Sequence, residues 1–583
     1  MTASKQINIA QYLYARLQQL GCDSLHGLPG DFNLLALDFV EGSGLKWVGS
    51  VNELNAAYAA DAYARVRGLG ALMTTFGVGE LSAVNGIAGS YAELAPVVHI
   101  VGTPSRQNQS QGAMLHHTLG NGNYRVFADI FSNITVAQAD LKDPSTAGAE
   151  IDRVLQACWV ESKPVYIELP VDIVTETIDA SRLDTPIELR KQTSDKEAED
   201  MVLDILLDRL YASKKPVFLV DGAAQRRKVM PIAHKLLEKL SIPVFVAPMG
   251  KGAVNESLPY FAGVYCGNGS KPEAKAAIEG SDLVITIGNI KSDLNTGFFS
   301  YSFSRLNTVD LHYDHAEIGY ATFDKVSFHS LIPRLTEAVD PSRLQPGAQE
   351  IPRPKTPPPP TSAELFDKDV ITHEWLWPRI STFLRQGDVV VADTGTAYIG
   401  MWDVGPLPLD VQIISQVLWS SIGYGCPAAQ GAALAARDAG KRVRTLCFEG
   451  DGSFQLTAQE LATIIHHELD VTMFLIENDG YTIPPARQER MVHIEPPTAT
   501  YNNIPQWQYH QIPQTLTSDP AKAAKITTWK ISSRAELDRL LADETFAQGK
   551  GLQFVEIHMP KMDGPRLLLQ THQRLSEAEG KGK

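Results

Sequence analysis

The sequence predicts an α/β protein built from three consecutive doubly wound parallel-sheet domains. Apolar helical and strand patterns alternate from Ile9 to about Leu169, which is typical of a parallel α/β domain. The polar segment 191–200 interrupts the alternation, and a second alternating region follows from about Met201 to Ala338. Residues 351–360 are rich in proline and predict a stiff, extended linker. We therefore expect an N-terminal domain at 1–190, a central domain at 200–345, the linker at 346–360 and a C-terminal domain at 361–583.

Local patterns predict the individual elements of the first two domains. Apolar residues at helical spacing predict a first helix from Asn8 to Leu20, which Gly21 ends. Short apolar runs predict strands at Lys46–Val51, Ala71–Phe76, Val97–Val101, Val217–Val220, Val244–Ala247 and Leu283–Ile287.

The composition is that of an ordinary globular protein, with 44% hydrophobic and 20% charged residues. A net charge of −15 and a pI near 5.5 argue against nucleic acid or an anionic membrane as a main partner. No segment approaches the roughly 18 uninterrupted apolar residues of a membrane helix, and the first residues form no apolar signal region. Five scattered cysteines without a CxxC motif indicate reduced thiols, so we expect a cytoplasmic protein.

Two glycine motifs in the C-terminal domain each follow an apolar strand pattern. Gly450-Asp451-Gly452 follows the pattern at 443–448, and Asn478-Asp479-Gly480 follows the pattern at 471–476. A helical stretch from about Thr457 to His467 lies between them, which completes a strand–helix–strand unit. Both motifs should then lie at the carboxyl edge of a parallel sheet, where hard oxygen donors suit Mg²⁺ or Ca²⁺ bridging a diphosphate. The glycines let phosphate oxygens approach the backbone closely.

This spacing resembles the thiamine diphosphate motif, and the chain as a whole is similar to the pyruvate decarboxylase family, in its fungal branch. The resemblance extends from about Ile9 to Gln570. The other segments that support it are 27–31 (GLPGD), 51–61 (VNELNAAYAAD), 76–82 (FGVGELS), 115–120 (LHHTLG) and 414–419 (ISQVLW).

The resemblance implies a thiamine diphosphate-binding fold, with a pyrimidine-binding first domain, a central domain without cofactor and a diphosphate-binding third domain. It implies thiamine diphosphate and Mg²⁺ as cofactors, with Asp451, Asn478 and Gly480 as metal ligands. In this family, first-domain and third-domain residues meet across a subunit interface, so the resemblance also implies a homo-oligomer, a dimer or a dimer of dimers. The implied cofactor-binding residues are Glu53, Thr394, Thr396, Ile414, Gly450, Asp451, Gly452, Ser453, Asn478, Gly480, Tyr481 and Ile483.

Glu53 is the residue expected to activate the cofactor. It stands at the start of a helix directly after a strand, where the helix dipole alone also favours a glutamate. The resemblance implies that its carboxylate hydrogen-bonds the pyrimidine N1′ and favours the imino tautomer, which takes the proton from the thiazolium C2.

Asp31, His116 and His117 are expected to manage protons around the substrate. Asp31 precedes an apolar run, where an aspartate is commonly a helix cap. The two histidines lie in a polar loop after a strand, and no Cys or Glu stands at metal-ligand spacing, so we do not expect a metal there. By resemblance, the three residues act around the substrate carboxylate and the enamine carbon, to which a histidine of near-neutral pKa suits proton donation.

The last catalytic acid of the family is displaced in this sequence. The family has a Glu immediately after the run that matches residues 480–483, but here Pro484–Gln488 stand before Glu489. Either Pro484 replaces the acid, or a segment is inserted and Glu489 is the acid on a longer loop. We favour the insertion because 489–493 recovers the family's order, although the prolines hinder an unbroken helix.

Several further positions bear on the site. Asp393 stands where the family usually has Glu, and Glu477 adds negative charge beside Asn478. Tyr398 is either a wall of the substrate pocket or a packed aromatic, and Ile414 either props the cofactor into its bent shape or is a core residue.

The sequence therefore predicts a lyase that decarboxylates a 2-oxo acid, with pyruvate giving acetaldehyde and CO₂ through an ylide and an enamine. One alternative is a carboligase, or a decarboxylase of an aromatic or indole 2-oxo acid. A further alternative is a non-catalytic thiamine-binding regulatory subunit, against which intact Glu53, Asp31 and the histidine pair argue.

Overall fold

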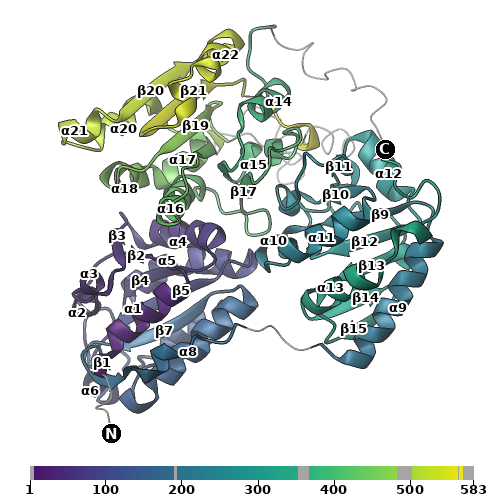
Figure 1. The fold of residues 1–583 in the computed structure, drawn as a ribbon. Coiled ribbons are helices and arrows are strands. Elements are labelled where there is room, and N and C mark those ends of the chain that lie inside the picture. Colours follow the sequence, from purple (N-terminus) through teal and green to yellow (C-terminus); the bar gives the residue numbers. More distant parts are fainter. Residues whose placement is uncertain (1–5, 190–193, 352–366, 482–501, 562, 569–583) are drawn as a thin grey trace, which may run out of the picture.

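The protein is described here by a computed structural model covering residues 6–189, 194–351, 367–481, 502–561 and 563–568. Three sheets flanked by helices follow one another along the chain (Figure 1). The predicted succession of three α/β units is therefore confirmed.

The N-terminal sheet has six parallel strands in the order β3-β2-β4-β5-β7-β6. Its strands are β2 (Ser24–Gly27), β3 (Lys46–Gly49), β4 (Gly70–Thr75), β5 (Val97–Thr103), β6 (Gln138–Asp140) and β7 (Val165–Pro170), with β1 (Gln6–Asn8) and β8 (Thr177–Asp179) forming a separate antiparallel pair. Its helices are α1 (Ile9–Gln19), α2 (Leu34–Leu37), α3 (Val40–Ser43), α4 (Glu53–Arg67), α5 (Val78–Ala92), α6 (Arg106–Ser110), α7 (Val126–Phe131) and α8 (Pro144–Glu161). Strand β3 ends at Gly49, short of the predicted Val51, because the Asn52 side chain caps α4 by accepting the Asn55 N–H.

The central sheet has the order β11-β10-β9-β12-β13-β14-β15. Its strands are β9 (Pro216–Val220), β10 (Val244–Val246), β11 (Phe261–Val264), β12 (Leu283–Ile287), β13 (Thr308–Leu311), β14 (His315–Ile318) and β15 (Ala321–Asp324). Its helices are α9 (Lys196–Ala212), α10 (Gly222–Arg226), α11 (Met230–Leu240), α12 (Pro272–Glu279) and α13 (Phe328–Ala338).

Two details of the central domain correct the sequence prediction. The sheet is not wholly parallel, since β14 and β15 pair antiparallel at one edge. Their connections are too short for the crossover that a parallel neighbour requires. The polar segment 191–200, predicted as a domain boundary, also contains the start of α9. Asp195 caps this helix by accepting the N–H groups of Glu197 and Ala198.

The C-terminal sheet has six parallel strands in the order β17-β16-β18-β19-β21-β20. Its strands are β16 (Val389–Ala392), β17 (Gln412–Ile414), β18 (Thr445–Gly450), β19 (Val471–Glu477), β20 (Ile526–Ile531) and β21 (Leu552–His558). Its helices are α14 (His373–Phe383), α15 (Thr396–Met401), α16 (Gly425–Asp438), α17 (Asp451–Thr457), α18 (Leu461–His466), α20 (Ile512–Thr515), α21 (Pro520–Ala523) and α22 (Arg534–Ala542). The helix after β18 begins at Asp451 rather than near Thr457, so this carboxylate lies in a first helical turn.

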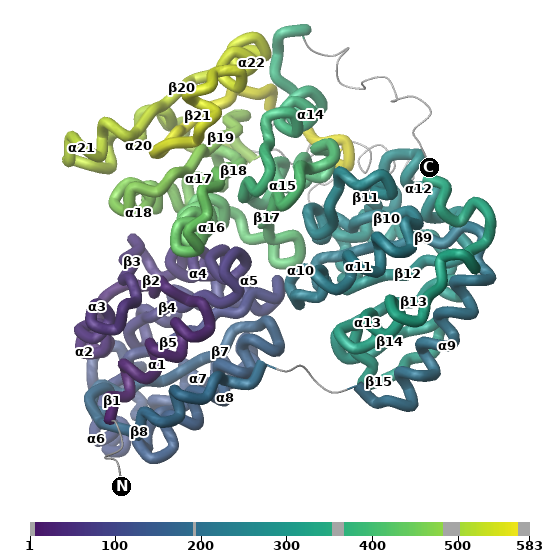
Figure 2. The backbone as a smooth tube through the Cα atoms, in the orientation of Figure 1, coloured from purple at the N-terminus to yellow at the C-terminus, as the bar shows by residue number. Residues whose placement is uncertain are grey.

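The first and third domains pack through α4 and α16, which lie side by side (Figure 2). Small residues make this close packing possible: a Cβ at Gly431 would lie 2.0 Å from the carbonyl oxygen of Ala59. All three domains meet at the buried Glu93 carboxylate, which is ion-paired with Arg226 (2.6 Å) and accepts the backbone N–H groups of Leu418 and Trp419.

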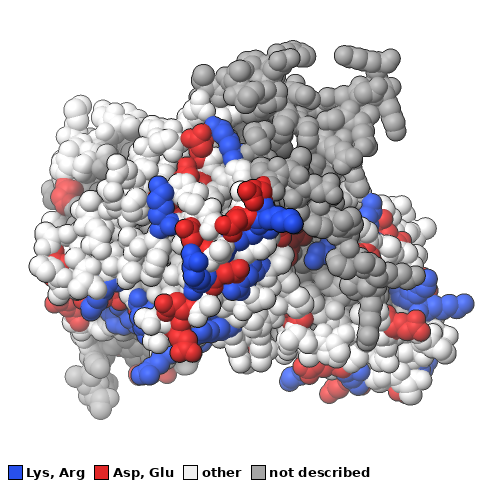
Figure 3. Space-filling view, turned by 90° about the horizontal axis from the view of Figure 1, so that it is seen from above, with Lys and Arg blue, Asp and Glu red and all other residues white. Residues whose placement is uncertain are grey.

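Acidic and basic side chains are interspersed on the face seen in Figure 3, beside a broad uncharged area. All five cysteines are buried and unpaired. No helix of the described residues is long and apolar enough to cross a membrane.

Candidate active site

The two glycine motifs meet at the carboxyl edge of the C-terminal sheet, because β18 and β19 are neighbouring parallel strands. The Asp451 carboxylate is 2% exposed and accepts the backbone N–H groups of Gly452 (2.7 Å), Gly480 (2.9 Å) and Asn478 (3.3 Å). A left-handed turn at Asp479 and Gly480 brings the second motif back toward this carboxylate. One acidic side chain therefore orders both motifs.

The backbone around the first motif leaves room for a ligand on one side and none on the other. No atom lies within 4 Å of the place that a Cβ at Gly450 would take. On the other side, a Cβ at Gly452 would lie 2.4 Å from the ring of Tyr481, whose hydroxyl donates to the Gly452 carbonyl (3.2 Å). Tyr481 therefore packs against the motif on the side opposite the open space.

The loop between β16 and α15 faces this edge. Ser453 donates its hydroxyl to the Thr394 carbonyl at 3.4 Å, and Thr396 is the first residue of α15. The Thr394 hydroxyl is buried and has no hydrogen-bond partner within the described part of the chain. A buried hydroxyl without a partner is costly, so this group is suited to a ligand that brings acceptor oxygens.

Burial raises the pKa of two aspartates near this edge to about 6, at Asp451 and at Asp393. The Asp393 carboxylate accepts the N–H groups of Gly425 (2.9 Å) and Gly423 (3.4 Å), so it fixes the start of α16. Of the two aspartates, Asp451 lies beside the open space at Gly450, where a bound cation would stabilise its charged form.

Glu53 is the first residue of α4, where its half-buried carboxylate faces α5. Burial raises the pKa of this carboxyl above its usual value. A Cβ at Gly79 would lie only 2.9 Å from Glu53 Oε1, so the missing side chain makes room for the carboxylate.

Asp31, His116 and His117 form one cluster, although Asp31 lies far from the histidines in sequence. His116 Nε2 is hydrogen-bonded to Asp31 Oδ2, and His117 Nε2 lies 3.6 Å from Asp31 Oδ1. Phe32 stacks on the His116 ring at 5.1 Å between centroids. The alternative of Asp31 as a helix cap is wrong, because Asn33 holds that position before α2. Asp31 adds a carboxylate to the two histidines as a third possible metal ligand, which their spacing along the chain did not indicate. The three ligand atoms lie within 4.8 Å of one another.

Family models of known proteins match all three units of this chain. The descriptions are thiamine pyrophosphate enzyme, N-terminal TPP binding domain (residues 7–121), central domain (203–335) and C-terminal TPP binding domain (393–557). The pyruvate decarboxylase of Aspergillus fumigatus is 44% identical over 97% of this chain and 96% of its own length. That of Aspergillus terreus is 43% identical over the same shares, and isozyme 1 of Saccharomyces cerevisiae is 41% identical over 97% and 98%.

The chain belongs to the pyruvate decarboxylase family of thiamine pyrophosphate enzymes. The residues of the C-terminal edge fit the diphosphate of that cofactor. They offer a buried hydroxyl without a partner at Thr394, open backbone at Gly450, and an acidic and an amide side chain in the two motifs.

One expectation about charge at this edge needs correction. Glu477 does not leave an uncompensated negative charge beside Asn478, because its carboxylate lies 2.6 Å from His558 Nδ1. Glu477 and Glu556 raise the pKa of His558 to about 9, so the imidazole is protonated at neutral pH and offsets the charge. Local sequence patterns do not indicate this pairing, since β19 and β21 bring the two residues together only in the folded sheet.

Four other positions have different outcomes. Tyr398 and Ile414 are both buried in hydrophobic cores, and their roles toward substrate and cofactor stay predictions. Ile483 and Glu489 lie outside the described residues, as does the Pro484–Gln488 segment.

Proposed function

We propose that this enzyme decarboxylates pyruvate to acetaldehyde and CO₂, using thiamine diphosphate and Mg²⁺. The observation that supports this best is the cluster of Asp31, His116 and His117, because two imidazoles around one carboxylate can accept and donate protons. The relatives named pyruvate decarboxylase also match nearly the whole chain.

Asp451, Asn478 and the Gly480 carbonyl would hold Mg²⁺, with the diphosphate oxygens against Gly450, Thr394, Thr396 and Ser453. A hard cation there would neutralise Asp451, whose burial otherwise favours the protonated form. When bound, thiamine diphosphate supplies the electron sink for the pair left behind by departing CO₂.

Glu53 would hold a proton at the pyrimidine nitrogen N1′. Burial raises the pKa of this carboxyl, and a carboxyl that shares a proton with N1′ stabilises the tautomer needed for deprotonation of C2. Asp31 would orient the two histidines, which deliver a proton to the substrate carbon after loss of CO₂. Glu489 would serve as the remaining acid if the inserted loop brings it to the same place.

We infer that the working unit is at least a homodimer, with a dimer of dimers as the larger alternative. The proton-transfer cluster is open to solvent in one chain, with the His116 side chain 61% exposed, yet this chemistry requires exclusion of water. Large apolar side chains are exposed around both halves of the site; they include Leu34, Val78, Leu81, Met114, Leu119, Ile422 and Leu456. A second copy covering this surface would close both sites of a symmetric pair.

We further propose that the enzyme acts in the cytoplasm, because five buried free thiols suit a reducing compartment. Sedimentation at assay concentration tests the assembly: a fully active monomer would refute the shared site.

Product analysis tests the function. Purified protein supplied with thiamine diphosphate, Mg²⁺ and pyruvate should release acetaldehyde and CO₂ in equal amounts. Parallel reactions with phenylpyruvate and indolepyruvate rank the substrates. Acyloin as the main product would favour the carboligase, an alternative that the displaced Glu489 makes worth testing. Cofactor binding without any product would favour the regulatory subunit.

A further inference from the structure

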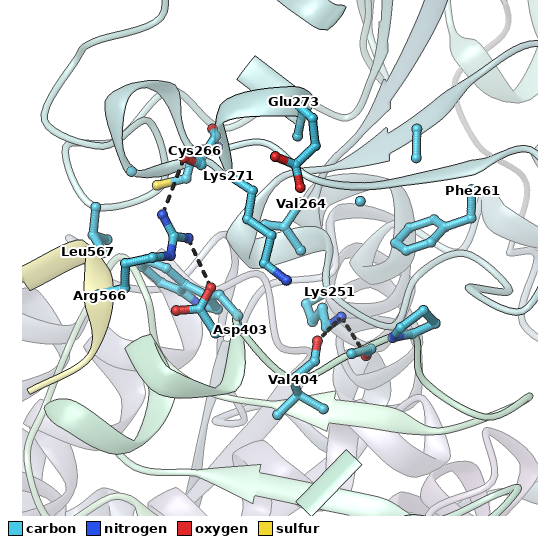
Figure 4. A pocket seen from close by; sticks show the side chains of 18 of the residues that line it. Lys251, Phe261, Val264, Cys266, Lys271, Glu273, Asp403, Val404, Arg566 and Leu567 are labelled. Carbon is cyan, nitrogen blue, oxygen red and sulfur yellow. Dashed lines mark hydrogen bonds and ion pairs between the residues drawn. The ribbon is translucent and has the colours of Figure 1, made fainter. Parts of the chain in front are cut away.

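A cavity of about 350 Å³ lies between the central and C-terminal domains, and its lining includes none of the site residues described above. Central-domain walls come from β11 and the start of α12, and C-terminal walls come from the end of α15 and residues 402–406 (Figure 4). Segment 566–567 closes one side. Its volume suits a small organic molecule, and it is at the low end of the range for ligand sites.

Two cations of the cavity wall are already engaged by protein groups. Lys251 is ion-paired with the buried Glu256 (2.6 Å) and also donates to the Val404 carbonyl (3.2 Å). Arg566 is ion-paired with Asp403 (2.9 Å) and donates to the Ser270 carbonyl (3.2 Å). The ion pairs lie within single domains, and the hydrogen bonds to the Val404 and Ser270 carbonyls join the central domain to the C-terminal domain.

Two charged side chains in the wall differ from these. The Lys271 ammonium and the Glu273 carboxylate both point toward the middle of the residues drawn in Figure 4. Neither forms an ion pair or a side-chain hydrogen bond with another described residue, and they do not pair with each other. The cavity therefore presents one positive and one negative group that are separated and unneutralised.

The rest of the lining is largely apolar. Phe261, Val264, Ile399 and Trp402 supply aromatic and aliphatic surface to the cavity wall. Burial raises the pKa of the Cys266 thiol to about 12, so the cavity contains no reactive thiolate at neutral pH. The lining is suited to binding rather than to chemistry.

We propose that this cavity binds a zwitterionic α-amino acid with an apolar side chain. The ligand carboxylate would pair with Lys271, its ammonium group with Glu273, and its side chain would lie against Phe261 and Trp402. An α-amino acid carries its ammonium and carboxylate groups on one carbon, so it can bridge two protein charges that do not form an ion pair with each other. Because the site lies between two domains, binding should also stabilise their interface.

Calorimetric titration of the holoenzyme with L-phenylalanine tests the proposal. This probe has no keto group, so the active site cannot turn it over. Lys271→Ala and Glu273→Gln should each weaken binding roughly tenfold, as expected for loss of one charged hydrogen bond. Lys275→Ala is the matched control, since it removes a cation from the same helix that bonds Asn268 and does not line the cavity. Val264→Trp should fill the space and abolish binding.

Two single-charge analogues separate the contributions. 3-Phenylpropanoate lacks the ammonium group and 2-phenylethylamine lacks the carboxylate, so both should bind roughly tenfold or more weakly than the amino acid. Acetaldehyde release from pyruvate confirms that each variant is folded. The proposal is wrong if wild-type enzyme does not bind L-phenylalanine, if the Lys271 and Glu273 variants bind it as tightly as wild type, or if 3-phenylpropanoate binds equally well.

Discussion

Replacing Gly79 by alanine should displace the Glu53 carboxylate, and so impair activation of the cofactor, while Glu53 itself is unchanged. The new Cβ would lie 2.9 Å from Glu53 Oε1 and 3.1 Å from Thr75 Cγ2. Favourable contacts begin at about 3.5 Å, so the carboxylate must move by about 0.5 Å or more. Misplacement of a reacting group by about 1 Å can cost about 10²-fold in rate, and we expect acetaldehyde release to fall roughly 10- to 100-fold.

The same substitution should not weaken the fold. Alanine is favoured over glycine by up to about 1 kcal/mol within a helix, which offsets the close approach of the new Cβ to Thr75 Cγ2 at the start of α5. Steady-state kinetics with saturating cofactor should therefore show a lower kcat at an unchanged or higher melting temperature. Gly42→Ala is the matched control, because no atom lies within 4 Å of its Cβ position. A Gly79→Ala enzyme that works at the wild-type rate would refute the placement of Glu53.

Three further predictions address other parts of the account. Asp451→Ala should abolish retention of thiamine diphosphate in a Mg²⁺-dependent titration, and unchanged affinity would exclude the proposed metal site. Glu489→Gln should lower acetaldehyde release while cofactor binding persists and the acyloin fraction rises; an unchanged rate would mean that the acid has been lost at Pro484. Burial raises the pKa of Glu80 from 4.5 to about 7, so its protonated form favours the folded state and that contribution is lost as pH rises from 4.5 to 7. The wild-type protein should therefore lose stability between pH 4.5 and 7, and Glu80→Gln should lose less, by up to about 3 kcal/mol in urea unfolding. The same pH dependence in both proteins would contradict the shift.

Sequence patterns predicted the strands and the motif edge well, because both depend on local signals. Apolar runs followed by glycine motifs located β18 and β19, and the parallel order of the sheet then brought Asp451 and Asn478 together. Helix caps were harder to predict, since a polar run such as 191–200 has the same composition whether it forms a loop or the first turn of a helix. Asp195 distinguishes the two only through its bonds to the following backbone.

Contacts between distant segments were beyond local patterns. Nothing near Glu477 in sequence indicates that His558 neutralises it, and nothing near Asp31 indicates that it bonds His116. The resemblance to a known family placed Asp31 and the histidines in one site, while the structure supplied the contacts. Gly79 shows the same limit, because its small size matters only through the position of Glu53.

Exchange of the C2 proton on bound thiamine diphosphate reports whether Glu53 activates the cofactor. We propose that Glu53 activates a cofactor that the C-terminal edge holds. Glu53→Gln should therefore bind the cofactor and Mg²⁺ as wild type does, yet exchange C2 with deuterium about 10²- to 10⁴-fold more slowly, because a neutral amide cannot support the tautomer that removes the proton. Wild-type exchange in this variant, with the cofactor fully bound, would contradict the account.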